Sequence, residues 1–165
     1  MTPTAIARHL VDSDATDALA RALAAQQPAR AVVHLHGDLG AGKSTLARAW
    51  LRALGVVGAV RSPTYTLVER YPLAAGEALH LDLYRIGDAG ELEFLGLDDA
   101  DATLWLVEWP ERGLAALPAA DLRVDLAVED AGRSVRLQAA SAAGHDWLTR
   151  LTASGELRAF PESNP

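Results

Sequence analysis

The residues with the most specific chemistry form a glycine-rich segment, 37–44, with the sequence GDLGAGKS. It matches the pattern G-x-x-x-x-G-K-[ST] at every fixed position, with an apolar stretch before it and a helical pattern after it. Such a loop turns its backbone N–H groups toward phosphate oxygens, and the start of the following helix adds its positive dipole end. Lys43 is expected to lie in a solvent-facing loop and to reach the β- and γ-phosphates, and the Ser44 hydroxyl is expected to hold Mg²⁺. The predicted phosphate-binding residues are Gly37, Asp38, Leu39, Gly40, Ala41, Gly42, Lys43, Ser44 and Thr45.

The base of the nucleotide is indicated by one unusual count. Of the 15 Lys and Arg residues in the chain, Lys43 is the only lysine. A guanine-reading Asn-Lys-x-Asp motif would need a second lysine, so it cannot exist here. Adenine is favoured by elimination, and ATP with Mg²⁺ is the expected ligand.

A phosphate loop of this kind also needs a carboxylate at the end of a neighbouring strand to hold the metal or its water. Two apolar segments end in an acid: residues 104–108 end at Glu108, and residues 78–82 end at Asp82. Either acid alone could be an ordinary solvated strand end, but the loop requires at least one of them. The sequence does not decide which of the two acids orients an attacking water.

Two further groups of polar residues lie near these segments. Residues 61–66, RSPTYT, are rich in hydroxyls and are either an edge strand or a segment that folds over the γ-phosphate. His34, His36 and His80 lack zinc-ligand spacing and no cysteine completes a site, so structural or solvent-facing positions are expected for them.

The elements that must hold these residues alternate between helix and strand. This order predicts a three-layer α/β domain of the P-loop NTPase type, with a mixed, partly parallel central sheet. Helices are expected at 14–27, 43–54, 88–95 and 145–151; strands are expected at 31–36, 64–71, 78–83 and 103–107, followed by a hairpin of 122–128 and 134–137.

Length and composition predict one domain. The chain has 165 residues, 50% of them hydrophobic, and we expect a single domain over 1–152 with a flexible tail over 153–165. No apolar run is long enough for a membrane span, no secretory signal is visible, and a cytoplasmic location is expected. The net charge of −7 argues against a broad nucleic-acid surface, so DNA is not expected as a partner.

Five motifs in order resemble the TsaE (formerly YjeE) family of bacterial ATPases, which support threonylcarbamoyladenosine formation in tRNA. The likeness runs from about residue 14 to about residue 136. The motifs are GDLGAGKST at 37–45, SPTYTLV at 62–68, HLDLYR at 80–85, ELEFLG at 91–96 and VEWPE at 107–111.

The resemblance implies roles for particular residues. Ser44, where the family usually has Thr, and Glu108 would hold Mg²⁺, Asp82 would lie near the γ-phosphate, and Trp109 would lie beside it. Thr64 would belong to the same nucleotide site. Thr16 and Arg133 would line the adenine or ribose, although plain helix-surface and hairpin-surface positions fit them equally well.

The resemblance also implies partners. ATP use would drive or reset a TsaB–TsaD type complex, with tRNA contacted only indirectly. Two other functions remain open: a small-molecule kinase, which would need a lid and an acceptor pocket, and a docking module that binds nucleotide without hydrolysing it.

Overall fold

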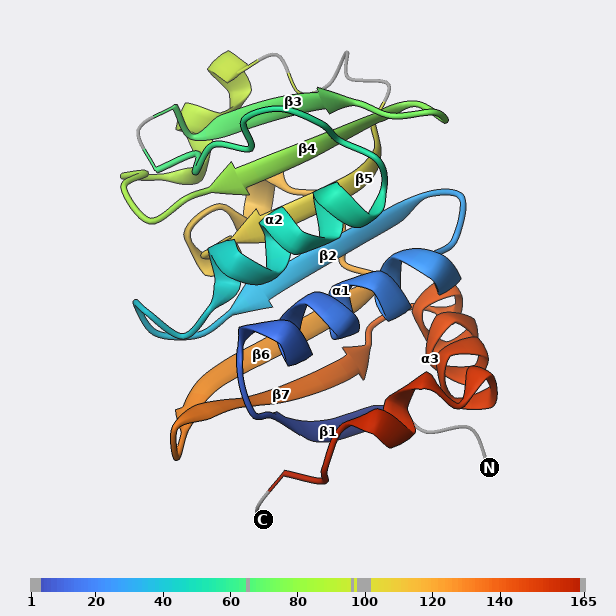
Figure 1. Cartoon of the computed structure of the whole chain (residues 1–165). Helices are drawn as coiled ribbons and strands as arrows, with labels where there is room; N and C mark the ends of the chain where they lie inside the picture. Colours follow the sequence, from blue (N-terminus) through green and yellow to red (C-terminus); the bar gives the residue numbers. More distant parts are fainter. Residues whose placement is uncertain (1–3, 65, 96, 98–101, 164–165) are drawn as a thin grey trace.

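A mixed sheet forms the centre of the computed structural model, which describes residues 4–64, 66–95, 97 and 102–163. Within these residues the sheet has seven strands in the order β1-β7-β6-β2-β5-β4-β3. Figure 1 shows this order from bottom to top. The strands are β1 (Ala5–Leu10), β2 (Ala31–His36), β3 (Val68–Pro72), β4 (Glu77–Asp82), β5 (Ala102–Glu108), β6 (Leu122–Glu129) and β7 (Gly132–Ala139), and the α-helices are α1 (Ser13–Gln26), α2 (Lys43–Ala53) and α3 (Ala142–Ser154).

The four central strands are parallel and the edges are antiparallel. β2 pairs in parallel with both β5 and β6, and β4 pairs in parallel with β5. The outer pairs β1–β7, β6–β7 and β3–β4 run antiparallel. The carboxyl ends of β2, β4 and β5 therefore meet at one edge of the sheet, and in register Asp82 lies opposite Glu108. The expected mixed, partly parallel α/β sheet is confirmed.

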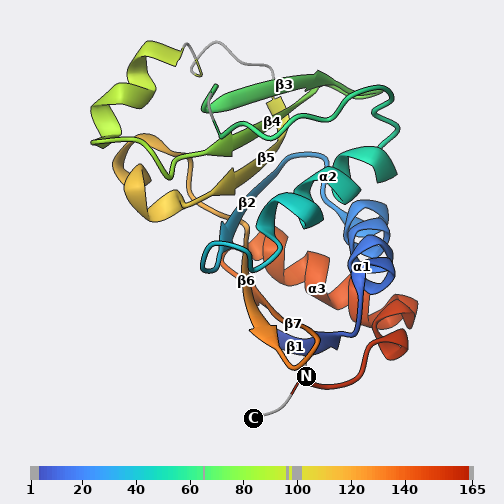
Figure 2. The same ribbon diagram turned by 60° about the vertical axis from the view of Figure 1, so that its left-hand side comes forward.

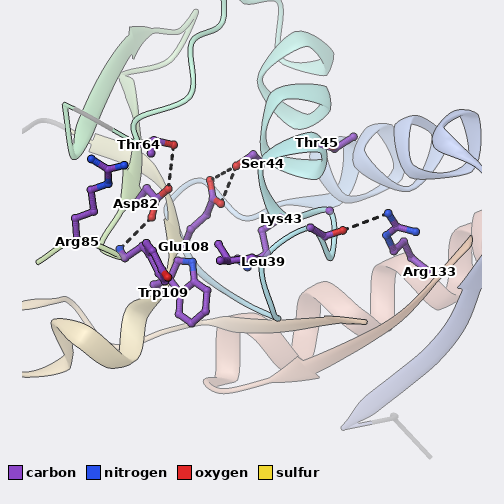
Figure 3. A pocket seen from close by; sticks show the side chains of 13 residues that line it. Leu39, Lys43, Ser44, Thr45, Thr64, Asp82, Arg85, Glu108, Trp109 and Arg133 are labelled. Carbon is purple, nitrogen blue, oxygen red and sulfur yellow. Dashed lines mark hydrogen bonds between the residues drawn. The ribbon is translucent and has the colours of Figure 1, made fainter. Parts of the chain in front are cut away.

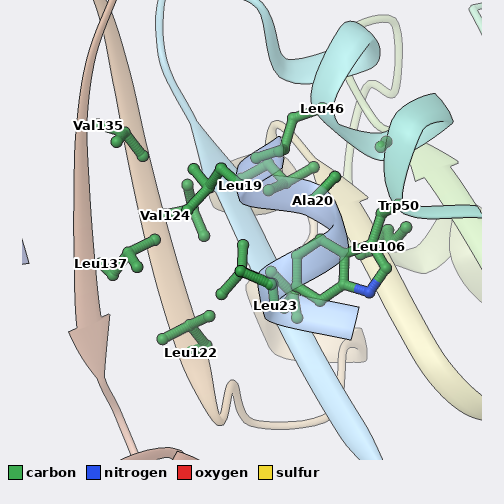
Figure 4. Packing of buried hydrophobic residues seen from close by; sticks show 14 of the residues in the cluster. Leu19, Ala20, Leu23, Leu46, Trp50, Leu106, Leu122, Val124, Val135 and Leu137 are labelled. Carbon is green, nitrogen blue, oxygen red and sulfur yellow. The ribbon is translucent and has the colours of Figure 1, made fainter. Parts of the chain in front are cut away.

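The two faces of the sheet are covered differently because side chains alternate along each strand. All three α-helices lie on one face (Figure 2), where they bury the larger core cluster. Trp50 of α2 and Trp147 of α3 are both fully buried there, with ring centroids 5.7 Å apart. Each large side chain buried in this way contributes about 1.5–3 kcal/mol. Figure 4 shows the part of this core between the helices and β6–β7.

The opposite face carries short 3₁₀ segments in place of α-helices. η1 (Ala89–Leu95), η3 (Pro110–Arg112) and η4 (Leu114–Ala116) lie over β4 and β5. Leu79 and Leu81 of β4 and Val107 of β5 form a second core cluster on this side. The expected third layer is therefore present over β4 and β5, but it is built from 3₁₀ turns, including the helix expected at 88–95.

The N-terminus and the segment after α2 differ from what the sequence pattern predicts. The strand β1 was not expected, because the only sequence signal near it is the N-cap of α1. It forms because β7 supplies its hydrogen bonds. The strand expected over 64–71 begins only at Val68, and Thr64 lies in the turn before it. Two residues of the family motifs, Tyr65 and Gly96, lie outside the described residues.

The C-terminal segment corrects the expectation of a flexible tail from residue 153. α3 continues to Ser154, and a 3₁₀ turn, η5 (Glu156–Ala159), follows. Leu157 and Phe160 are buried against the larger core, and the Ser163 hydroxyl donates to Glu129. Two apolar side chains spaced across a turn anchor the segment, so the packed domain extends through residue 163. Among the described residues, no helix has the length and apolarity to cross a membrane.

Candidate nucleotide-binding site

The glycine-rich loop connects the central strand β2 to the start of α2. Gly37, Gly40 and Gly42 all have positive φ angles, of 150°, 81° and 107°. Gly37 has a second constraint, since a Cβ there would meet the backbone carbonyl of Leu126. This curled loop and the first turn of the 11-residue α2 border a cavity of about 410 Å³. The cavity lies where backbone amides and the helix dipole favour an anion.

Lys43 is more enclosed than the sequence indicated. It is the first residue of α2 and only 5% exposed, whereas a solvent-facing loop position was expected. Its Nζ donates hydrogen bonds to the carbonyl oxygens of Gly37 and Asp38 and lies 4.5 Å from the centroid of the Trp109 ring. Burial lowers the pKa of Lys43, and nearby Glu108 and Asp82 oppose this shift. The ammonium is held at the cavity wall by neutral carbonyl acceptors that an anion could replace.

Ser44 and Glu108 face each other across the cavity floor (Figure 3). The Ser44 hydroxyl lies 2.8 and 3.0 Å from the two carboxylate oxygens of Glu108, which is 2% exposed at the end of β5. A hydroxyl and a carboxylate are oxygen ligands of the kind Mg²⁺ prefers. Within the described part of the chain, no cluster of three or more His, Asp or Glu side chains could hold a metal. A serine hydroxyl paired with one carboxylate fits Mg²⁺, which typically takes its other ligands from phosphates and water.

Asp82 ends the neighbouring strand and is held by two donors. The backbone N–H of Tyr84 donates to one carboxylate oxygen at 3.0 Å, and the Thr64 hydroxyl lies 3.5 Å from the other. Burial raises the pKa of Asp82 above that of an ordinary aspartate. Thr64 also shares a 2.7 Å hydrogen bond with Ser62, so the hydroxyl-rich segment reaches the cavity through Thr64.

Two aromatic side chains, Trp109 and Tyr84, also line the cavity, and Arg112 packs on both of their rings. Trp109 follows β5 in a left-handed conformation, φ 57°, and its ring lies 4.9 Å from that of Tyr84. The guanidinium of Arg112 lies 5.1 Å from the Tyr84 ring and 5.8 Å from the Trp109 ring. Trp109 was predicted for this site. Tyr84 and Arg85, which also line the cavity, were missed as site residues although they stand only two and three positions after Asp82.

A second cavity of about 250 Å³ adjoins the first and shares Gly42, Thr45 and Arg133 with it. Thr16 of α1 and Arg133 of β7 both line this second cavity, and Arg133 donates to the Gly40 carbonyl at 3.2 Å. The structure thus brings together at one cavity two residues that are 117 positions apart in sequence.

The loop residues divide into two groups by position. Leu39, Gly40, Gly42 and Thr45 line the first cavity with Lys43 and Ser44. Gly37, Asp38 and Ala41 do not line it; Ala41 is buried, and the carbonyls of Gly37 and Asp38 hold the lysine.

His80 is the buried neighbour that sequence reasoning did not place in the site. Its ring is fully buried, and Nε2 lies 2.6 Å from Glu108 Oε2. The signal available was its position two residues before Asp82, on the same face of the strand. The pairing of β4 with β5 is what brings it to Glu108.

A parallel-centred sheet with this loop after its central strand, and with carboxylates at two adjacent strand ends, defines a P-loop NTPase type of α/β domain. Comparison with known proteins gives the family. The sequence profile of "Threonylcarbamoyl adenosine biosynthesis protein TsaE" matches residues 10–136. The chain belongs to the TsaE family.

Individual relatives agree with this assignment. The chain is 47% identical to the tRNA threonylcarbamoyladenosine biosynthesis protein TsaE of Haemophilus influenzae, over 73% of this chain and 78% of that protein. The TsaE of Streptomyces coelicolor is 40% identical over 79% of this chain and 93% of its own length. The crystal structure of Bacillus subtilis YdiB superposes with a TM-score of 0.77 at 26% identity, covering 92% of this chain and 96% of YdiB.

Proposed function

We propose that this chain is a Mg²⁺-dependent ATPase that supports N6-threonylcarbamoyladenosine formation in tRNA in the cytoplasm by driving or resetting a TsaB–TsaD type complex. The observation that carries the proposal is the Ser44–Glu108 pair beside Lys43 at the start of α2. This arrangement combines a metal-ligand pair, a cation and free helix amides around one cavity, which is what phosphoryl transfer requires. Membership of the TsaE family supports the pathway.

Each side chain has a distinct role in this proposal. Lys43 exchanges its bonds to the loop carbonyls for β- and γ-phosphate oxygens, and Ser44 and Glu108 hold Mg²⁺. Bound Mg²⁺ supplies charge neutralisation at the phosphates. Asp82 lies opposite Glu108 at the strand ends, and its raised pKa makes it a stronger proton acceptor than an ordinary aspartate. It is therefore assigned to the water that attacks the γ-phosphate.

The partner is proposed to hold the tRNA. The chain carries a net charge of −7, which opposes binding of a phosphate backbone over a wide surface. ATP turnover by the chain alone is accordingly expected to be slow, and to rise when the TsaB–TsaD type complex is present.

Phosphate release tests this function directly. It would be measured for the wild type, for Glu108→Ala, and for Ser44→Thr as a matched variant that keeps the hydroxyl. Each would be assayed alone and with the TsaB–TsaD pair and tRNA. We expect partner-stimulated release that Glu108→Ala lowers by about 10²-fold or more and that Ser44→Thr largely preserves.

Other outcomes separate the alternatives. Transfer of phosphate to a small molecule would mean a kinase. Nucleotide-dependent binding to the partner without phosphate release would mean a docking module. No release and no nucleotide-dependent binding would refute the proposed function.

A further inference from the structure

A buried histidine lies directly behind the metal-facing carboxylate. His80 and Glu108 stand on neighbouring parallel strands, with both side chains on the face that α2 covers. His80 has no exposed surface, and its Nε2 lies 2.6 Å from Glu108 Oε2. Within the described part of the chain, Ser44 is the only other side chain that hydrogen-bonds to this carboxylate.

The proton in this contact belongs to the histidine. The Ser44 hydroxyl donates to the carboxylate. A carboxylate can only accept, so Nε2 is the donor in its contact with Oε2. The other ring nitrogen, Nδ1, is buried and has no partner among the described residues. A proton on Nδ1 would be a buried donor without an acceptor, which is costly. The contact is therefore a hydrogen bond from His80 Nε2–H to a carboxylate oxygen of Glu108.

This arrangement has a consequence for metal binding. The Ser44 hydroxyl has to serve both Mg²⁺, through an oxygen lone pair, and Glu108, through its single hydrogen. The buried His80, by contrast, contacts the carboxylate alone and is not shared with the metal. Fixed orientation of a ligating carboxylate by a buried donor typically contributes about 10–100-fold to metal affinity.

We propose that His80 is a positioning residue: its Nε2–H holds Glu108 in the orientation that receives Mg²⁺. The inference rests on the proposed Mg·nucleotide site. It concerns the geometry of the ligand and does not make His80 a catalytic residue.

Two substitutions at one position separate the hydrogen bond from the packing. His80→Gln places an amide N–H at the same ε position along the side chain, whereas His80→Leu fills the space with no donor. His34→Leu is the matched control, because His34 is also a buried strand histidine, 6% exposed, but lies on β2 facing away from α2. Thermal unfolding without ligand would report the stability of each variant.

The readout is binding and not turnover. A fluorescent ADP analogue would be titrated at fixed concentration against Mg²⁺, with a parallel titration of the analogue in EDTA. We expect His80→Leu to raise the Mg²⁺ concentration for half-saturation by about 10–100-fold, and His80→Gln to stay within about threefold of wild type. His34→Leu should show wild-type Mg²⁺ dependence, and affinity in EDTA should be the same for all four proteins.

A double substitution provides a second test that does not depend on the Gln variant. In a Glu108→Ala background, His80→Leu should add nothing to the Mg²⁺ requirement, because the group it positions is gone. Additive effects, a wild-type Mg²⁺ dependence in His80→Leu, or equal losses in the Gln and Leu variants would overturn the positioning role. If the wild type itself showed no Mg²⁺-dependent nucleotide binding, the proposed function would fail, and the positioning role with it.

Discussion

Replacing Lys43 with methionine separates the stability of the empty protein from the affinity for nucleotide. Methionine keeps a long unbranched stem and removes only the ammonium. The ammonium makes two hydrogen bonds to loop carbonyls, each worth about 1.5–3 kcal/mol for a charged donor. Its burial, which lowers the pKa of Lys43, costs a comparable amount. We therefore expect Lys43→Met without ligand to unfold within about 1 kcal/mol of wild type.

The nucleotide-bound state should respond far more strongly. A ligand at 100 times its Kd stabilises a protein by about 2.7 kcal/mol. For a chain of this size that is a rise in Tm of about 5–11 °C. Loss of about 2–3 kcal/mol of ammonium–phosphate interaction weakens Kd by about 30–150-fold. At the same ligand concentration the stabilisation then falls to about 0.3–0.9 kcal/mol, or about 1–3 °C.

Thermal unfolding with and without Mg²⁺ and a non-hydrolysable ATP analogue measures both quantities. Arg52→Met is the matched control, since Arg52 is an exposed cation in the last turn of the same helix. It should keep the full ligand-induced shift. A wild-type shift in Lys43→Met would refute the role of the lysine in phosphate binding. A loss of more than about 3 kcal/mol of unfolding free energy in unliganded Lys43→Met would show that the hydrogen bonds of the ammonium and the cost of its burial do not cancel.

Three further predictions concern Asp82, the base and α3. Burial raises the folded-state pKa of Asp82, so the stability that its protonated form gives the fold is fully present below the ordinary pKa of 3.8 and is lost as pH rises through the raised pKa. Asp82→Asn should therefore gain stability over wild type between pH 4 and pH 7 while losing phosphate release. A pH-independent difference in Tm between the two proteins would contradict this. ATP should bind more tightly than GTP by calorimetry, because the only lysine, Lys43, lies in the loop; equal affinities would contradict it. Gly144→Ala should destabilise the protein by about 1–3 kcal/mol in urea unfolding, because the added Cβ would meet the Asp121 carbonyl, and an unchanged midpoint would show that α3 can shift.

The sequence by itself determined the local features. The spacing of Gly37, Gly42, Lys43 and Ser44 predicted a turn that only glycines can make, followed by a helix start, and the structure has both. Apolar segments ending in an acid predicted that Asp82 and Glu108 lie at strand ends, as they do. These features depend on backbone conformation and on residue periodicity over a few positions, so they can be read from short stretches of sequence.

Tertiary structure decided which of these pieces touch. The pairing of β4 with β5 brings His80 under Glu108, and no local pattern encodes the partner of a strand. β1 and the segment after α3 are short and of unremarkable composition, and they became ordered because β7 and the core offered hydrogen bonds and apolar surface. The burial of Lys43 was also not predicted, because it depends on a contact between distant segments. The Trp109 ring lies beside its ammonium, and the position of Trp109 depends on where β5 ends beside β2. Contacts between distant segments are set by the packing of the whole sheet, which periodicity along one segment does not specify.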